Sequence, residues 1–465
     1  MRAVSAPDSA RSQPGGSIRR RMFVLALPAV GEQLLNTMVG LADVFLVGNL
    51  APATAALLGY DSAAALTAVG LGNQFSWIVM VLFMAVGIGA TALVARAVGA
   101  RDETSLGRIV RQVALLGVLV GVTATALGLL AAEPFLATLN APQETRAIGV
   151  EYIHITALTF LPTALLIAIT ACLRGAGDTR TPLLLMLAVN TINIAVTWLL
   201  VNGQLGMPAL GVTGAALGAA LARGLGGIAA VVLMLRGHAG LRLVLEWRPD
   251  PEMLRRLVRV GLPTAGEQFV FQAALLIFVR FVTNLGATAY AAHNITITIE
   301  SVSFLPGMGY AAATGALVGQ ALGARRPDEA ERSAYEGLFQ GGLMMSALGV
   351  LMALFPAQLV SLFTNDPMVV AAATPPLRAA GLVQPALAVS FILLGALRGA
   401  GDTRWPLYSR LFTTWVVRLP LTFVVVGQLG GGLPGVWLAM CTDFTLQAIM
   451  ALWRFSSGKW QKIEV

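Results

Sequence analysis

Long apolar segments constrain this chain more than any single motif does. Twelve segments can be distinguished, and each is long enough to cross a hydrocarbon core of about 30 Å, which takes roughly 20 residues. Because a backbone in lipid must satisfy its own hydrogen bonds, each segment is expected to be an α-helix. The expected spans are residues 22–48, 64–95, 106–131, 147–172, 181–202, 209–235, 257–284, 288–322, 334–356, 369–397, 405–428 and 433–455.

Composition excludes the main alternatives to a membrane protein. Apolar residues make up 57% of the 465 residues and charged residues only 12%, whereas a soluble protein carries about 25% charged residues. Disorder requires low hydrophobicity and is excluded as well. The fold class expected is therefore an all-α polytopic membrane protein.

Basic residues are unevenly distributed along the chain. With these spans, one side of the membrane receives 26 of the 31 basic residues, and the opposite side receives only Arg146 and Arg378. Cytoplasmic loops are rich in Lys and Arg, so we expect a multi-pass protein of the inner, or plasma, membrane with both termini in the cytoplasm. The other three, Arg223, Arg280 and Arg418, fall inside helices.

Neither the net charge nor the cysteines indicate another class of partner. The net charge is +8, but the arginines lie between apolar runs rather than in one patch, so no nucleic-acid partner is expected. Cys172 and Cys441 lie far apart in apolar runs, so neither a disulfide nor a zinc site is expected. The lipid bilayer is the expected surrounding.

Two motifs occur twice. LPAVGEQ at 27–33 returns as LPTAGEQ at 262–268, an offset of 235, and RGAGDTR at 174–180 returns unchanged at 398–404, an offset of 224. The difference of 11 predicts an insertion between Asn49 and about Ala68. The glycines of RGAGDTR predict a tight turn in which Asp178 and Asp402 cap the following helices.

The repeat predicts the domain organisation. Each half holds six expected helices, and because six is even, both halves enter the membrane from the same side. The two six-helix bundles are then related by a pseudo-two-fold axis along the membrane normal and enclose a cleft, which suits alternating access. The expected divisions are an N-terminal tail 1–21, an N-lobe 22–235, a linker 236–256, a C-lobe 257–455 and a C-terminal tail 456–465.

Five acidic residues are expected at bilayer depth, where charge is costly and indicates function by default: Glu32, Asp43, Glu267, Glu300 and Asp443. Asp43 breaks the repeat, since its counterpart is Phe278, and burial in a cleft would let it load and release a proton or exchange it for a cation. Asn190, Asn193 and Thr197 are its expected polar neighbours. A merely hydrogen-bonded acid at a helix end is the alternative.

The remaining acids divide into a matched pair and unmatched positions. Glu32 and Glu267 occupy equivalent positions, four residues after a proline, which favours a shared structural role such as satisfying freed backbone groups. Glu300 has Ser76 as its counterpart and shares a helix face with His293, so the two could relay protons or bind a cation. A satisfied buried pair is the alternative.

No catalytic motif was found. The chain lacks GxxxxGK[ST], HExxH and G-x-S-x-G, and its only lysines are Lys459 and Lys462. ATP hydrolysis by the chain and an enzymatic role are therefore not expected. No cofactor is expected beyond a coupling ion, H⁺ or Na⁺; a Na⁺ ion near Asp43 or Glu300 is the metal that the pattern allows.

The sequence resembles the multidrug and toxic compound extrusion (MATE) family of transporters, prokaryotic DinF and NorM types. The resemblance rests on LPAVGEQ and ADVFLVGNL (42–50), NTINI (190–194), ALVGQALGAR (316–325) and both copies of RGAGDTR. It implies twelve helices in two bundles and export of cationic, often aromatic, compounds against H⁺ or Na⁺.

The resemblance also implies site residues. In DinF-type relatives an aspartate of helix 1 couples the ion, and Asp43 occupies that position. Asn193 matches an asparagine of helix 5, but Thr197 stands where those relatives often have an aspartate, so one charge is missing. In the NorM branch acids of helices 7 and 8 matter more; Glu267 lies early in helix 7, and Glu300 with His293 is the better second site.

Two alternatives to a drug exporter stay open at this point. One is a flippase for lipid-linked oligosaccharide, which would favour a cationic cleft; here the acids expected at bilayer depth outnumber the arginines expected there five to three. The other is an uncoupled channel or scaffold. In each case we expect a monomer.

Overall fold

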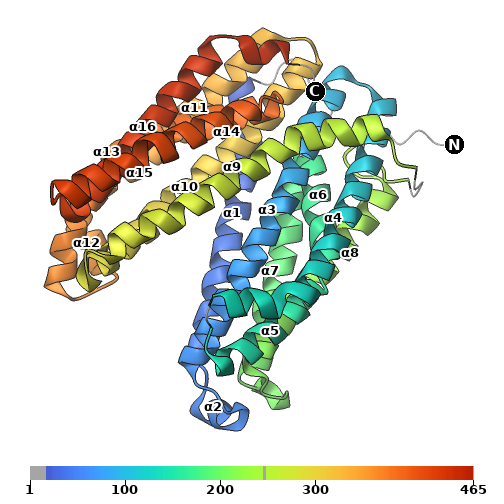
Figure 1. The fold of residues 1–465 in the computed structure, drawn as a ribbon. Coiled ribbons are helices and arrows are strands. Elements are labelled where there is room, and N and C mark those ends of the chain that lie inside the picture. Colours follow the sequence, from blue (N-terminus) through green and yellow to red (C-terminus); the bar gives the residue numbers. More distant parts are fainter. Residues whose placement is uncertain (1–16, 140, 245–247, 464–465) are drawn as a thin grey trace. The chain divides into compact units, whose positions relative to one another are not determined.

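The computed structural model describes residues 17–139, 141–244 and 248–463, and most of these residues are helical (Figure 1). Within these described ranges, eleven helices are long and apolar enough to cross a membrane, and the bent pair α5–α6 makes twelve if it forms one span. In the described part of the chain β-type pairing is limited to one isolated bridge between His238 and Leu241. The predicted all-α membrane fold is confirmed.

The helices pack into two compact units, which do not coincide with the halves of the sequence. Unit 1 contains residues 31–94 and 102–258. Unit 2 contains residues 95–101 and the chain from Arg259 onward, together with the described residues up to Val30. Because α1 and α3 are each divided between the units, the units do not test the lobe boundaries expected from the repeat. These boundaries stay predictions.

The first half of the chain forms these elements in order: α1 (Ile18–Gly48), α2 (Pro52–Leu58), α3 (Ser62–Ala100), α4 (Glu103–Thr138), α5 (Gln143–Ala157), α6 (Phe160–Gly175), α7 (Arg180–Val201), the 3₁₀ turn η1 (Gln204–Gly206) and α8 (Gly211–Arg236).

The second half forms α9 (Pro251–Thr283), α10 (Ala287–Gly323), α11 (Pro327–Leu354), α12 (Pro356–Ser361), α13 (Pro367–Gly399), α14 (Arg404–Leu411), the π-helix η2 (Phe412–Arg418), α15 (Leu419–Thr422), the π-helix η3 (Phe423–Gln428), α16 (Gly432–Ser456) and the 3₁₀ turn η4 (Lys459–Lys462). Of the predicted N-terminal tail, residues 1–16 lie outside the described residues.

The predicted insertion forms a short helix of its own. α2 lies between α1 and α3, whereas α9 and α10 are joined by only the residues from Asn284 to Gly286. The extra segment is fixed within unit 1, because the Ala51 N–H donates to Asn202 Oδ1 at 2.8 Å and the Val212 N–H donates to the Tyr60 hydroxyl at 3.0 Å.

The fourth expected span, 147–172, is not one straight helix. α5 and α6 meet at a bend of 50° around Leu158 and Thr159. Pro162 has no N–H to donate to the carbonyl four residues earlier, and Thr156 Oγ1 adds hydrogen bonds to the Tyr152 and Ile153 carbonyls, which favours bending. The prediction of a continuous helix was wrong for this reason.

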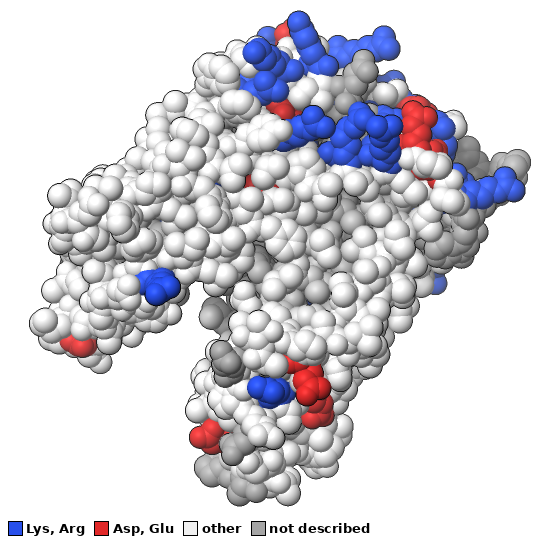
Figure 2. All heavy atoms as spheres, in the orientation of Figure 1, with Lys and Arg blue, Asp and Glu red and all other residues white. Residues whose placement is uncertain are grey.

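Basic side chains gather at one end of the helices within each unit (Figure 2). In unit 1 this end includes the start of α4 and the turn after α6, and in unit 2 it includes the turns after α3, α10 and α13. Arg146 and Arg378 lie at the opposite ends, as the spans require. This charge asymmetry is the pattern that the sequence predicts.

Candidate functional site

The same ion pair occurs in both units and joins the two repeated motifs. In unit 1, Arg174 Nη1 lies 2.8 Å from Glu32 Oε1. In unit 2, Arg398 Nη2 lies 2.7 and 2.9 Å from the two oxygens of Glu267. Each glutamate comes from a GEQ motif and each arginine from the start of RGAGDTR. The expected shared structural role therefore takes the form of an ion pair rather than a bond to freed backbone groups.

The RGAGDTR turns are alike in backbone but differ in partner. Asp178 Oδ1 accepts hydrogen bonds from the Arg180 and Thr181 N–H groups at 3.1 and 3.0 Å, so the predicted cap is confirmed there. Asp178 Oδ2 also lies 3.0 Å from His238 Nε2. In the second copy, Asp402 Oδ2 instead accepts from Arg454 Nε at 2.7 Å, and the start of α14 has no side-chain cap.

Three of the predicted site residues of unit 1 lie together between α1 and α7. Thr197 Oγ1 donates to Asn193 Oδ1 at 3.1 Å, which leaves the Asn193 amide N–H₂ as the donor toward other groups. Asn193 lies close enough to the Asp43 carboxylate to influence it. Thr197 and Asn193 are buried, with 0% and 2% of their surface exposed. Thr197 thus orients the Asn193 amide beside Asp43.

The rest of the surroundings of Asp43 are polar but incompletely satisfied. Arg223 of α8 exerts an electrostatic attraction on the carboxylate. Asp43 Oδ1 and Asn190 Nδ2 are both buried without a hydrogen-bond partner among the described residues. Tyr152, which the Asp43 and Arg223 charges both influence, donates its hydroxyl to Asn73 Oδ1 at 3.0 Å. Unsatisfied buried oxygens of this kind indicate a place for a proton, an ion or a water.

Unit 2 has a different arrangement at the equivalent of Asp43. Phe278 is 1% exposed, and the guanidinium carbon of Arg418 lies 3.9 Å from the centre of its ring. Arg418 Nη1 also lies 3.7 Å from Asp443 Oδ2, with 4% and 0% of the two side chains exposed. A tethered cation therefore occupies, in unit 2, the region where unit 1 presents an acid.

Glu300 lies within reach of the same arginine. It is 0% exposed, neither carboxyl oxygen has a hydrogen-bond partner among the described residues, and the Arg418 charge acts on it. His293 packs its ring against Phe278 and Trp437, with centroids 6.0 and 5.7 Å away. His293 and Glu300 are both buried on α10. Among the described residues, no hydrogen bond joins these two side chains.

The two clusters have different charge balances. Around Asp43 one carboxylate faces one arginine, with amide and hydroxyl groups beside them. Around Arg418 two buried carboxyl groups share one guanidinium, so one carboxyl is left over, and an uncompensated buried charge is costly. A proton on one of the carboxyls would remove that cost. Among the described residues no group of three His, Cys, Asp or Glu side chains could hold a metal ion.

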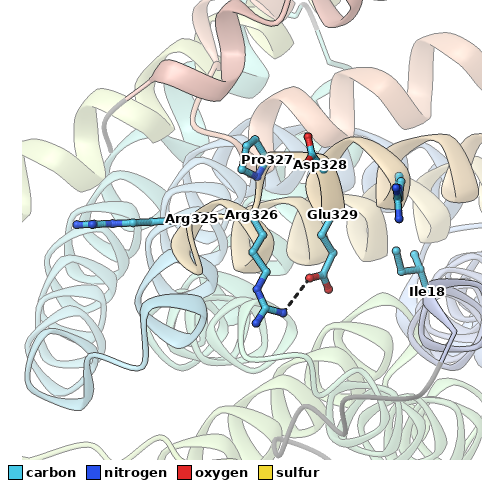
Figure 3. Close-up of a pocket in the computed structure, with 7 residues that line it drawn as sticks. Ile18, Arg325, Arg326, Pro327, Asp328 and Glu329 are labelled. Atoms are coloured by element: carbon cyan, nitrogen blue, oxygen red, sulfur yellow. Dashed lines mark hydrogen bonds and ion pairs between the residues drawn. The ribbon is translucent and has the colours of Figure 1, made fainter.

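A surface cavity of about 450 Å³ lies in unit 2 (Figure 3). Its lining is mostly charged, and it includes an ion pair of 3.3 Å between Arg326 and Glu329. Glu329 also binds Arg21 of α1 at 2.9 Å. None of the predicted site residues lines it, and its exposed, polar walls differ from those of a typical small-molecule site.

Sequence reasoning missed the partners rather than the acids. Arg223 and Arg418 are recognisable as arginines inside apolar runs, but their spacing does not show that Arg223 faces Asp43 or that Arg418 pairs with Asp443. Tyr152 carries no signal of its own in the sequence. The signal for the matched ion pair was present, because Glu32 and Arg174 recur together in the two halves.

Comparisons with known proteins point to one family. A family model described as MatE matches residues 28–199 and 263–424. The chain is 35% identical over 449 residues to a protein of Thermotoga maritima described as a probable multidrug resistance protein NorM, covering 96% of this chain and 94% of that protein. It is 29% identical to the multidrug resistance protein PmpM of Pseudomonas aeruginosa, covering 93% and 90% of the two chains.

Solved structures agree in fold. One described as an outward-facing multidrug resistance MATE transporter of the MOP superfamily aligns with a TM-score of 0.87 at 22% identity, covering 99% of this chain and 100% of that chain. A MATE structure in a bent conformation aligns with a TM-score of 0.87 at 23% identity, covering 97% and 98%.

Proposed function

This chain belongs to the MatE family of membrane transporters, and from that premise we propose that it exports drugs and other organic cations in exchange for H⁺ or Na⁺. The names of its relatives in Thermotoga maritima and Pseudomonas aeruginosa support multidrug efflux as the activity. The substrates are small cationic or aromatic molecules, and the chain works as a monomer in the inner, or plasma, membrane with both termini in the cytoplasm.

The observation that carries this proposal is the environment of Asp43. The carboxylate has a buried oxygen without a partner, an amide donor in Asn193 and a positive charge in Arg223. Binding of a proton removes the charge and ends the attraction to Arg223. An ion that changes these contacts can favour one arrangement of the helices over another, which is all that a ligand can do.

The proton is the better candidate for the coupling ion at this site. Sodium ions prefer several oxygen ligands, and Thr197 offers a hydroxyl where DinF-type relatives often have a second carboxylate. Arg223 adds a positive charge that opposes a second cation nearby. Na⁺ in place of H⁺ is the alternative outcome of the experiment below.

The acids of unit 2 contribute a second titratable group. Glu300 and Asp443 share Arg418, and one of the two carboxyls can hold a proton without leaving the guanidinium unpaired. In this proposal His293 lines the cluster, while Glu32 and Glu267 hold helices together through their ion pairs. Alternating access between two bundles follows from the duplicated six-helix design.

Transport in proteoliposomes tests the proposal most directly. Purified protein is reconstituted, and ethidium movement is followed with a pH gradient or a Na⁺ gradient imposed separately. We expect ethidium movement that follows the pH gradient and is lost in Asp43→Asn. A response to the Na⁺ gradient alone would replace H⁺ by Na⁺, and a response to neither gradient would overturn coupled export.

The oligosaccharide flippase is the second candidate, and the same vesicles address it. A phosphate-bearing lipid substrate would need unpaired positive charge in the cleft, whereas Arg418 is committed to Asp443, and Arg174 and Arg398 are committed to glutamates. Movement of a fluorescent lipid-linked saccharide, without any ethidium transport, would favour the flippase.

A further inference from the structure

The C-terminal tail after α16 is anchored in unit 2 by one aromatic residue. The chain turns at Gly458, whose φ of +65° suits glycine, and continues as η4. Trp460 is 0% exposed and stacks on Phe455, with ring centroids 4.7 Å apart. Its indole N–H donates to the Phe455 carbonyl at 2.7 Å. Trp460 belongs to an apolar cluster with the ends of α10 and α13, so the tail is held by burial.

Arg96 connects this tail to a helix from the first half of the chain. Arg96 is half-buried in the last turns of α3, and its Nη2 donates to the Ile463 carbonyl at 2.9 Å and to the Ala400 carbonyl at 3.0 Å. Ala400 lies in the second RGAGDTR turn. A single guanidinium therefore ties together α3, the turn after α13 and the tail.

Glycines bring the last turn of α3 directly onto α10. A Cβ at Gly99 would meet the Gln320 carbonyl oxygen, and a Cβ at Gly323 would meet the Arg96 carbonyl oxygen. The turn after each helix contains an arginine with φ of +57°, Arg101 after α3 and Arg325 after α10. The two helix ends lie backbone to backbone, with no side chain between them at these glycines.

This packing explains why α3 is divided between the units. Residues 62–94 pack in unit 1, whereas residues 95–101 pack in unit 2. A rearrangement that moves α3 with the rest of unit 1 must lift this last turn off α10. The glycine contact covers only the last turn of α3, but lifting this turn also breaks both hydrogen bonds of Arg96.

We propose that the tail, residues 457–463, is a strap that retains the last turn of α3 on unit 2. Trp460 is the fixed end of the strap, and the Ile463 carbonyl is the end that holds Arg96. Release of the strap accompanies the step in which α3 leaves unit 2; that step rests on the proposed alternating-access function, whereas the retention itself does not.

Spin labels measure this retention without any transport. Labels are placed at exposed positions, Ala100 at the end of α3 and Asp328 at the start of α11, after Cys172 and Cys441 have been replaced by Ala. Double electron–electron resonance then gives the distance distribution in lipid nanodiscs. The intact chain should give one narrow distance.

Shortening the chain to Gly458 removes the strap. We expect a second, longer distance between the labels to appear. A chain ending at Ile463 keeps Trp460, and an oxygen of its terminal carboxylate can still accept from Arg96, so it serves as the matched control and should keep the single distance. An unchanged distribution in the chain ending at Gly458 would overturn the proposal.

Two further variants separate release of the strap from unfolding. Arg96→Ala should also produce the longer distance, whereas Arg101→Ala, which removes a charge from the same helix end, should not. Labels at Asp328 and Arg404, both in unit 2 and off α3, report on the unit itself. If the distance between these two labels changes in the shortened chain, unit 2 has been disrupted. Arg96→Ala then decides: the proposal stands if this variant lengthens only the distance between Ala100 and Asp328, and it is refuted otherwise.

Discussion

The two units treat the same helix position in opposite ways. In unit 1, the first helix presents Asp43 to Asn193 and Arg223. In unit 2, the equivalent position is Phe278, and its ring lies under the guanidinium of Arg418. The helices that carry both regions are held by equivalent ion pairs, those of Glu32 and Glu267. The repeat therefore supplies the support, and the departures from it mark the places where the units differ in chemistry.

The largest test of this comparison removes the unmatched acid. Asp43→Asn keeps the shape and the hydrogen-bonding capacity of the side chain but cannot take up or release a proton. We expect gradient-driven ethidium transport to fall by at least about tenfold, equivalent to roughly 1.4 kcal/mol. Glu133→Gln, at an exposed position of α4, is the control. Normal transport by Asp43→Asn would remove this residue from the mechanism.

Removing the tethered cation tests the other side of the comparison. Arg418→Met leaves Asp443 buried without its partner, and breaking a buried pair costs about 3–5 kcal/mol. We expect a lower midpoint of thermal unfolding in detergent. Adding Asp443→Leu to the same chain should restore most of the loss, because an apolar pair of similar size carries no desolvation cost. A double variant as unstable as Arg418→Met would contradict the pairing.

The shared ion pair allows the units to be compared under the same change. Glu267→Gln should destabilise the protein by about 3 kcal/mol, the lower end for a buried pair. Glu32→Gln should cost less, because Glu267 is 2% exposed and has Arg410 as well as Arg398 nearby, whereas Glu32 is 9% exposed and has Arg174. Unfolding midpoints of the two variants decide the order, and the reverse order would contradict this explanation.

A smaller effect is expected at the residue that orients Asn193. Thr197→Val removes one hydrogen bond, worth about 1 kcal/mol, and frees the Asn193 amide to turn its oxygen toward Asp43. We expect ethidium transport to fall several-fold while the protein stays folded. Thr197→Ser keeps the donor and should behave like the unchanged chain. Equal losses in both variants would contradict this role for the hydroxyl.

The smallest effect concerns how matched helices begin. Asp102 caps α4 by accepting from the Ser105 N–H at 2.9 Å, and hydrogen bonds from Ser105 lower the pKa of this carboxyl. Its counterpart Arg326 precedes Pro327 and has no side-chain cap. Asp102→Ala should lower the unfolding midpoint slightly at neutral pH. Because the pKa is lower in the folded state, this difference should shrink as the pH falls through that pKa; a constant difference would rule out the charged cap.

The helices and the fold class could be predicted from the sequence, but the pairing of side chains on distant helices could not. Apolar runs and the repeat were sufficient for the helices, the fold class and the insertion that forms α2, because length and periodicity express these directly. The bend between α5 and α6 escaped prediction, since the apolar run continues through Leu158 and Thr159. The pairing of Arg418 with Asp443 also escaped, because contacts between distant helices depend on how the helices rotate in the bundle.

The candidate site shows the same limit. Asp43, Asn193 and Thr197 could be grouped from the sequence through the family resemblance, and the structure brings them together. Arg223 could be noticed but not assigned to them. Residues 456–465 were predicted only as a C-terminal tail, because a single tryptophan does not reveal what covers it; Trp460 is nevertheless fully buried.

The crossing of α3 and α10 has a consequence for the ancestry of the chain. Gly99 packs on the helix of Gly323, and Gly323 packs on the helix of Gly99. Such reciprocity is characteristic of the contact between two identical molecules related by a two-fold axis. A half-length ancestor with this sequence could have associated with its own copy through the same glycine, and fusing two copies of its gene would have kept that contact intact.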